Sequence, residues 1–182
     1  MTTIFRRLFQ LACVAAAGAA SPAHAATICV DPATPGCQTT IQAGVDAAAA
    51  GDTVTVAKGT YFESVLIPAG KNGLILAGAG TIDPHAVPND PNDPNDPNDP
   101  FAGATPVAIG VLSNDVRIEG LSIQNGRAEG VRAIADGLTL NKVSIRGPAG
   151  DCVLVIGGGA QITASLLRGC GDRAVDITGN DA

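Results

Sequence analysis

Residues 114–179 divide into three consecutive blocks of 22 residues that carry apolar side chains at the same places, and this repeat constrains the fold most. Five columns of the aligned blocks are apolar throughout: Val116, Leu138 and Ala160; Ile118, Leu140 and Ile162; Ile123, Ile145 and Leu167; Val131, Val153 and Val175; Ala133, Val155 and Ile177. A sixth column, Leu121 and Val143, is broken only by Ser165. A fixed period of this length is typical of solenoid proteins, in which each repeat packs only against its neighbours.

Within each block the apolar residues fall into three short runs with a period of two, which is the pattern of a strand with one buried face. A single coil of such strands cannot bury its apolar face alone. Coils stacked at a strand spacing of about 4.8 Å align equal positions into aliphatic ladders. We therefore predict an all-β fold, a right-handed parallel β-helix with coils of about 22 residues. The alternative is an antiparallel sandwich whose strand spacing coincides with the repeat.

Less regular coils precede the three blocks. Alternating apolar pairs stand at Val54 and Val56, at Val65 and Ile67, and at Leu74 and Leu76, and the pattern resumes at Val107, Ile109 and Val111. Together with the blocks, these runs predict about five to six coils.

A helix is predicted before the first coil, within residues 38–50. Thr39 and Gln42 have the spacing of a capping box, and the apolar residues from Ile41 to Ala49 lie on one helical face. Gly51 would end the helix. The open end of a β-helix exposes apolar core and unpaired strand edges, so we expect this helix to cap it. The alternative is a helix packed on the side of the solenoid.

Composition excludes one class of partner. The 182 residues include 11 basic and 17 acidic side chains, a net charge of −6, and aromatic residues make up only 3%. An acidic chain is poorly suited to the nucleic-acid backbone, and so few aromatic rings provide no base-stacking platform. We therefore predict that nucleic acid is not a partner.

The first 25 residues have the three parts of a secretory signal peptide. A pair of arginines, an apolar run and the small-residue pattern Ala23-His24-Ala25 follow one another. We predict cleavage after Ala25, a β-helix domain over residues 26–182, and a secreted, periplasmic or cell-surface location reached by general or twin-arginine export. A short buried or anchoring helix is the alternative. Nothing later in the chain approaches the roughly 20 apolar residues of a membrane-spanning helix.

Four cysteines follow the signal peptide: Cys29, Cys37, Cys152 and Cys170. An even number in an exported chain predicts disulfides. A bridge between the first two would close a turn-rich loop, and the last two lie in adjacent blocks, where a bridge or two buried thiols are the alternatives. The spacing fits no zinc pattern, and His85 is the only histidine after the signal peptide, so no metal site is predicted.

An insertion over residues 84–104 contains four tandem Asn-Asp-Pro triplets. Proline at every third position excludes helix and interior strand, so we predict an extended loop that acts as a solvated spacer. A weak Ca²⁺ site is the alternative, because the triplets supply four carboxylates: Asp90, Asp93, Asp96 and Asp99. No other cofactor is predicted.

Three motifs between Thr40 and Gly80 carry a family resemblance: the helix from Ile41 to Ala49, Gly51-Asp52-Thr53-Val54, and Gly59-Thr60-Tyr61. This stretch resembles the opening of the right-handed β-helix proteins of the pectin-lyase-like superfamily, including pectin methylesterases. The resemblance implies a secreted β-helix protein. It implies no particular activity, because this opening builds the cap and the first coil.

A second stretch, from Gly150 to Gly157, is similar to the Gly-Asp-Asp-Cys strand of polygalacturonases. A single carboxylate, Asp151, stands where that family has two, and the family's catalytic histidine and Arg-Ile-Lys strand are absent. Inverting hydrolysis of a glycosidic bond needs a pair of carboxyl groups. This likeness therefore implies no hydrolase activity.

The superfamily resemblance implies a substrate groove along the outer face of one sheet, and the strands after the longest loop are the candidates. Six charged residues lie on or just before these strands: Glu129, Arg132, Asp151, Asp172, Arg173 and Asp176. One interpretation is a uronan-processing site, in which carboxylates transfer protons and Arg132 binds a uronate carboxylate. The other is a solvated charged face, which Leu154 interrupts and no aromatic residue lines.

Two functions follow as hypotheses. The first is a non-catalytic exported protein for surface interaction or binding of extracellular polysaccharide. The second is the N-terminal part of a carbohydrate-active enzyme: a pectin or uronan lyase, esterase or hydrolase. The sequence stops three residues into a fourth block, at Ala182, without a polar terminal cap. This predicts either that the chain is the front part of a longer protein or that its last coil is covered by something else.

Overall fold

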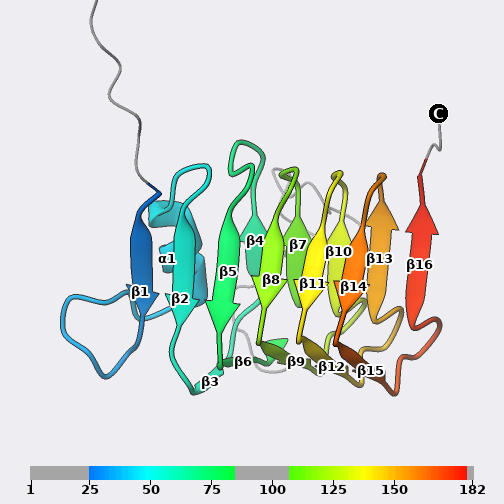
Figure 1. The fold of residues 1–182 in the computed structure, drawn as a ribbon. Helices are drawn as coiled ribbons and strands as arrows, with labels where there is room; N and C mark the ends of the chain where they lie inside the picture. Colours follow the sequence, from blue (N-terminus) through cyan, green and yellow to red (C-terminus); the bar gives the residue numbers. More distant parts are fainter. Residues whose placement is uncertain (1–24, 85–106, 180–182) are drawn as a thin grey trace, which may run out of the picture.

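The computed structural model describes residues 25–84 and 107–179, which wind into a parallel β-helix with three sheets (Figure 1). Sheet A consists of β1 (Thr27–Val30), β2 (Thr53–Val56), β5 (Ile75–Gly78), β8 (Arg117–Glu119), β11 (Thr139–Asn141) and β14 (Gln161–Thr163). Sheet B consists of β3 (Thr60–Tyr61), β6 (Thr81–Ile82), β9 (Ser122–Gln124), β12 (Ser144–Arg146) and β15 (Leu166–Arg168). Sheet C consists of β4 (Val65–Ile67), β7 (Ile109–Val111), β10 (Val131–Ala133), β13 (Val153–Ile156) and β16 (Val175–Thr178).

Every strand pair among the described residues is parallel, which confirms the predicted fold class and excludes the antiparallel sandwich. The pairing follows the repeat, because Val131 is opposite Val153 and Val153 is opposite Val175. From β2 onward, each coil contributes one strand to each sheet, in the order A, B, C, whereas β1 adds a sixth strand to sheet A alone. In Figure 1 sheet A faces the viewer and sheet B runs along the lower side.

The interior is filled by the predicted aliphatic ladders. One ladder of sheet A joins Leu76, Ile118 and Leu140, and all three side chains are fully buried. Parallel strands stack equal residues directly above one another, so each aliphatic side chain packs on its equivalents in the coils on either side. Full burial of such a side chain is worth about 1.5–3 kcal/mol. The repeat therefore supplies the main stabilising free energy as well as the topology.

A second ladder, of polar side chains, fixes the turns that lead from sheet C to sheet A. The side-chain oxygen of Asn72 accepts from the backbone N–H of Asn114 at 3.1 Å, and that of Asn114 accepts from Asp136 at 3.0 Å. Asp136 in turn accepts from the N–H of Gly158 at 2.7 Å. Each side chain satisfies a turn donor one coil further along the solenoid, which ties successive turns together.

Helix α1 (Ile41–Ala47) covers the N-terminal end of the solenoid, as predicted, and contacts β1, β2 and β4. It packs so closely that a Cβ on Gly44 would lie 2.6 Å from Val30 and 2.9 Å from Val54. Glycine is therefore required at this point of contact. The predicted span of 38–50 was too long, because Gln38 instead forms an isolated parallel bridge with Val30.

The predicted capping box was wrong by one residue. Thr40, and not Thr39, is the N-cap, and its hydroxyl accepts from the N–H of Ala43 at 3.1 Å. The Gln42 side chain does not turn back to the cap. It joins the helix to the first coil, where it accepts from Leu66 N–H at 2.7 Å and donates to Leu66 O at 3.1 Å. The cap donors are instead satisfied by Glu63, whose two oxygens accept from the N–H groups of Ile41 and Gln42 at 2.7 and 2.9 Å.

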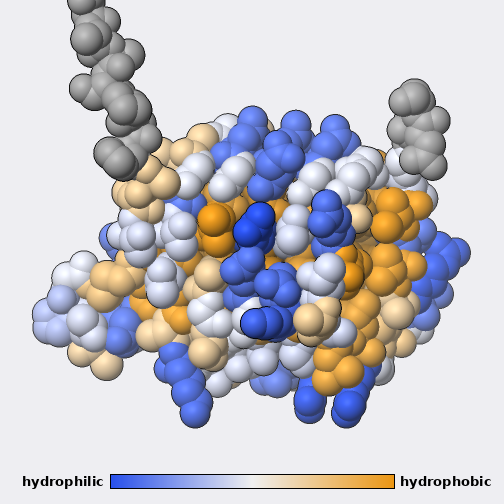
Figure 2. Space-filling model, in the orientation of Figure 1, coloured by the Kyte–Doolittle hydropathy of each residue, from blue (hydrophilic) through white to orange (hydrophobic). Residues whose placement is uncertain are grey.

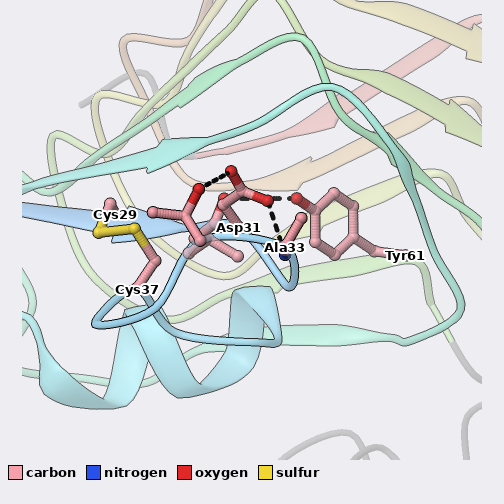
Figure 3. The surroundings of a disulfide bond; sticks show 7 residues. Cys29, Asp31, Ala33, Cys37 and Tyr61 are labelled. Carbon is pink, nitrogen blue, oxygen red and sulfur yellow. Dashed lines mark hydrogen bonds between the residues drawn. A yellow bond between two sulfur atoms is a disulfide. The ribbon is translucent and has the colours of Figure 1, made fainter.

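The segment before the helix contains a strand that the sequence pattern did not predict, followed by the expected turn-rich loop. Residues 27–30 form β1, the first strand of sheet A, and the disulfide Cys29–Cys37 closes the turn that follows it, with a Cα separation of 4.9 Å (Figure 3). Asp31 orders this turn, because its carboxylate accepts from Ala33 N–H at 2.9 Å and from the Thr34 hydroxyl at 2.6 Å. These hydrogen bonds hold the pKa of Asp31 below its ordinary value.

The second disulfide, Cys152–Cys170, is also present, with a Cα separation of 5.2 Å. It joins the second and third of the 22-residue blocks across adjacent turns between sheets B and C. This outcome favours the predicted bridge over two buried thiols.

Two predicted segments lie outside the described residues. They are the signal peptide that precedes Ala25 and nearly all of the Asn-Asp-Pro insertion, with its candidate Ca²⁺ ligands.

Candidate functional site

The strands that were predicted to line a groove all belong to sheet C. Arg132, Leu154 and Asp176 form one outward row in successive coils, as expected from the repeat. Leu154 therefore separates the two charged members of the row. The other four candidates lie in the turns just before these strands.

Glu129 and Arg132 form an ion pair within one coil. The guanidinium of Arg132 lies 2.7 Å from one carboxylate oxygen of Glu129 and 2.9 Å from the other. Both side chains are mostly buried, with 15% and 12% of their surface exposed. A partly buried pair that loses one partner leaves an uncompensated charge, so this pair is a structural element of the fold.

The remaining charged residues of sheet C are also engaged. Arg173 pairs with Asp176 three residues later. Asp151 is buried and accepts a hydrogen bond from the backbone N–H of Arg173 at 2.7 Å, in the equivalent position of the next coil. Asp172 is exposed, and its backbone N–H donates to Gly150 at 3.2 Å. Five of the six predicted residues thus use their side chains to hold the solenoid or one another.

The outer face of sheet B has a different character. A shallow hollow of about 180 Å³ is lined by Thr81, Ser122, Ile123, Gln124, Ser144 and Arg146. The strand register places Thr81, Ser122 and Ser144 in one outward row. Two residues further along each strand, Gln124, Arg146 and Arg168 form a second row. Hydroxyl, amide and guanidinium groups therefore lie together on this face.

The polar groups of this face remain available for a ligand. Arg146 and Arg168 are exposed, and neither guanidinium forms an ion pair or hydrogen bond with any described side chain or backbone group. Gln124 donates to the buried carboxylate of Asp83 at 2.9 Å, which orients its amide at the edge of the hollow. Among the described residues, sheet B thus combines a concave surface with uncommitted hydrogen-bond donors.

Sequence reasoning did not single out these residues, because serine and arginine at outward positions are typical of any solvated strand. A signal was nevertheless present in the repeat. Ser122 and Ser144 occupy one column of the 22-residue alignment, and Arg146 and Arg168 occupy another. Repetition of one polar residue type in one outward column marks a functional row better than charge alone does.

A larger hollow of about 720 Å³ lies near the C-terminal end of the solenoid, lined by Asp136, Ile156, Gly157, Gly158, Thr178 and Gly179. Its one carboxylate, Asp136, already accepts from the backbone N–H of Gly158. The surrounding surface is apolar, with Ile156 45% and Ile177 52% exposed, and Figure 2 shows apolar surface gathering at this end. Apart from Asp136 and Thr178, the residues that line this hollow carry no polar side chain.

Across residues 25–84 and 107–179, no group of three or more His, Cys, Asp or Glu side chains is arranged to hold a metal ion. In the same part of the chain, no helix has both the length and the apolar character needed to cross a membrane.

The chain has no match among models of known protein families, among curated proteins or among solved structures.

Proposed function

We propose that this chain is a non-catalytic, exported β-helix protein that binds extracellular polysaccharide through the outer face of sheet B. The observation that carries the proposal is the hollow on that face, where hydroxyl and guanidinium groups that the fold does not use lie in register across successive coils. Sugars are bound by several such groups arranged along an extended surface. The rigid spacing of a solenoid provides that surface without a closed pocket.

Export is part of this proposal and has separate support. The structure contains two disulfides, and disulfides persist in oxidising compartments outside the cytosol. The signal peptide proposed for residues 1–25 would deliver the chain to such a compartment. The likeness of residues 40–80 to the pectin-lyase-like superfamily agrees with this location and is likewise a proposal.

The sheet C residues support a binding role over a catalytic one. A general acid or base must keep an oxygen available to the reacting group, and the carboxylates of Glu129 and Asp176 are each paired with an arginine. An active site at these sheet C residues, as in one form of the enzymatic alternative, would require these pairs to open.

The proposal is tested by measuring binding to a panel of neutral and acidic polysaccharides, together with product release over long incubations. We expect saturable binding of at least one polysaccharide and no new reducing ends or unsaturated products. A Ser122→Ala and Ser144→Ala double variant should bind more weakly, whereas Thr139→Ala, at an outward position of sheet A, should bind as the parent does. Turnover that is lost on Asp151→Asn would establish the enzymatic alternative. Absence of binding to every polymer would refute the proposed function.

A further inference from the structure

The second outward row of sheet B places cationic groups at a regular spacing. Arg146 lies directly opposite Arg168 in the next coil, and neighbouring strands of a sheet lie about 4.8 Å apart. Arg127 is exposed in the turn that follows β9, one coil earlier. Two consecutive coils therefore each carry one guanidinium in this row, whereas Gln124 occupies the row position in the coil that carries Arg127.

These arginines differ from the other arginines of the described chain. Arg117, Arg132 and Arg173 each form an ion pair with a carboxylate two or three residues away. Arg127, Arg146 and Arg168 have no such partner within residues 25–84 and 107–179. The nearest acidic member of the row is Asp83, which is buried and accepts from the amides of Gln124 and Asn125. The fold thus leaves positive charge uncompensated on this face.

Unpaired guanidinium groups favour one class of ligand. A guanidinium presents a planar fork of donors that matches the oxygens of a carboxylate or a sulfate. The hydroxyls of Ser122 and Ser144, in the neighbouring row, are suited to the neutral hydroxyl groups of a sugar. A row of guanidiniums beside a row of hydroxyls is therefore complementary to a polymer that carries both anionic groups and hydroxyls along its length.

The net negative charge of the chain does not prevent an anionic ligand from binding to these arginines. The whole sequence carries −6. Charges separated by more than about 8 Å are largely screened at physiological ionic strength, so contacts with the nearest guanidiniums dominate once the ligand is bound. Repulsion by the rest of the chain acts mainly on the rate of association.

We propose that the arginine row of sheet B, Arg146 and Arg168, selects linear anionic polysaccharides, with their carboxylate or sulfate groups on the guanidiniums and their hydroxyls on the serine row. This inference rests on the proposed function, because it specifies the ligand class of the same site.

The experiment measures the affinity of the full chain for polygalacturonate, dextran sulfate and neutral dextran. It compares the parent with an Arg146→Gln and Arg168→Gln double variant. The matched control is Arg117→Gln, an exposed arginine on sheet A. Both substitutions lie on outer faces, and circular dichroism verifies that the variants fold. We expect the double variant to lose at least about tenfold in affinity for the anionic polymers. The control should stay within about twofold, and higher salt should weaken binding by the parent more than binding by the double variant.

The polygalacturonate and dextran sulfate arms distinguish a carboxylate ligand from a sulfate ligand, and either result supports the proposal. Binding of anionic polymer that is unchanged in the double variant would overturn it. Binding of neutral glycans alone would overturn it too, while the proposed polysaccharide-binding function would stand. If no polymer binds, both proposals fail together, and this result is distinct from the other two.

Discussion

Glu63 illustrates how a single residue holds the N-terminal cap. Its carboxylate accepts from the first two N–H groups of α1, donors that have no partner within the helix. The carboxyl is also partly buried, and this desolvation outweighs the two hydrogen bonds and raises its pKa above the ordinary value of 4.5. The folded chain therefore holds this proton more tightly than the unfolded chain does.

The sign of the resulting pH effect follows from linkage. Because the folded pKa of Glu63 is raised, its contribution to stability is greatest below 4.5 and decreases as the pH rises through the folded pKa. We expect Glu63→Gln to have a free energy of unfolding close to that of the parent in acid, because the protonated carboxyl and the amide each accept fully through one oxygen only. As the pH rises towards neutrality, the parent should lose stability relative to this variant, because only the parent must release a proton whose folded pKa is raised. Urea unfolding of both proteins across this range measures the difference, and a parent that gains stability relative to the variant with rising pH would contradict the assignment.

Asp52 lies at the same end of the solenoid, and its pKa is shifted in the direction opposite to that of Glu63. Its two oxygens accept from the N–H groups of Ala26 and Ala49, both at 2.7 Å. These hydrogen bonds, with that of Ala49 the larger cause, hold the pKa of Asp52 below its ordinary value. Its contribution to stability is therefore present at neutral pH and is lost in acid, in the direction opposite to that of Glu63.

At the scale of the elements, the ladders show how burial changes along the solenoid. Ile118 and Ile162 occupy the same position of sheet A, in β8 and β14. Ile118 is fully buried between two coils, whereas Ile162 is only partly buried in the last coil of the described chain. One residue type at one position of the repeat therefore occupies two different environments.

Alanine substitutions at Ile118 and at Ile162 test how much the stacking of aliphatic side chains between coils contributes to stability. Ile118→Ala leaves a cavity between coils that cannot collapse, so we expect a loss of about 2–5 kcal/mol in the free energy of unfolding. Ile162→Ala removes the same atoms from a partly exposed site, and its cost should be less than half as large. Chemical denaturation of both variants compares the two losses. Equal losses would show that coil stacking does not determine the burial of this position.

At the scale of the whole molecule, the two disulfides constrain different parts of the solenoid. Cys29–Cys37 closes a local turn with a sequence separation of 8, and Cys152–Cys170 joins two coils with a separation of 18. A cross-link that closes a longer loop restricts the unfolded chain more. Cys152 is also fully buried and packs against the aliphatic core.

We therefore expect replacement of Cys152 and Cys170 by alanine to destabilise the chain by about 3 kcal/mol. Replacement of Cys29 and Cys37 by alanine serves as the control and should cost less, because that loop is shorter and lies at one end. Thermal unfolding of the two double variants under identical conditions gives the order. A larger loss for the Cys29 and Cys37 variant would contradict this account.

The sequence by itself determined the architecture. Apolar residues that recur every 22 positions are all buried when the chain forms a stack of coils, because equal positions then pack on one another. It also determined the outward row of Arg132, Leu154 and Asp176, since strand alternation fixes which side chains face out. It did not predict β1 or the N-cap residue Thr40. The four residues of β1 lie outside the three 22-residue blocks, and so short a segment shows too little apolar alternation to indicate a strand.

Only the tertiary structure determined which charged side chains have an ion-pair or hydrogen-bond partner among the described residues. Glu129, Arg132, Asp151 and Arg173 look equally available in a sequence, yet three-dimensional packing engages each of them in an ion pair or with a backbone N–H. Arg146 and Arg168 belong to the same repeat, and their guanidiniums have no ion-pair or hydrogen-bond partner among the described residues. Pairing depends on turn geometry and on side-chain reach across coils, and neither is encoded in the period of an apolar pattern.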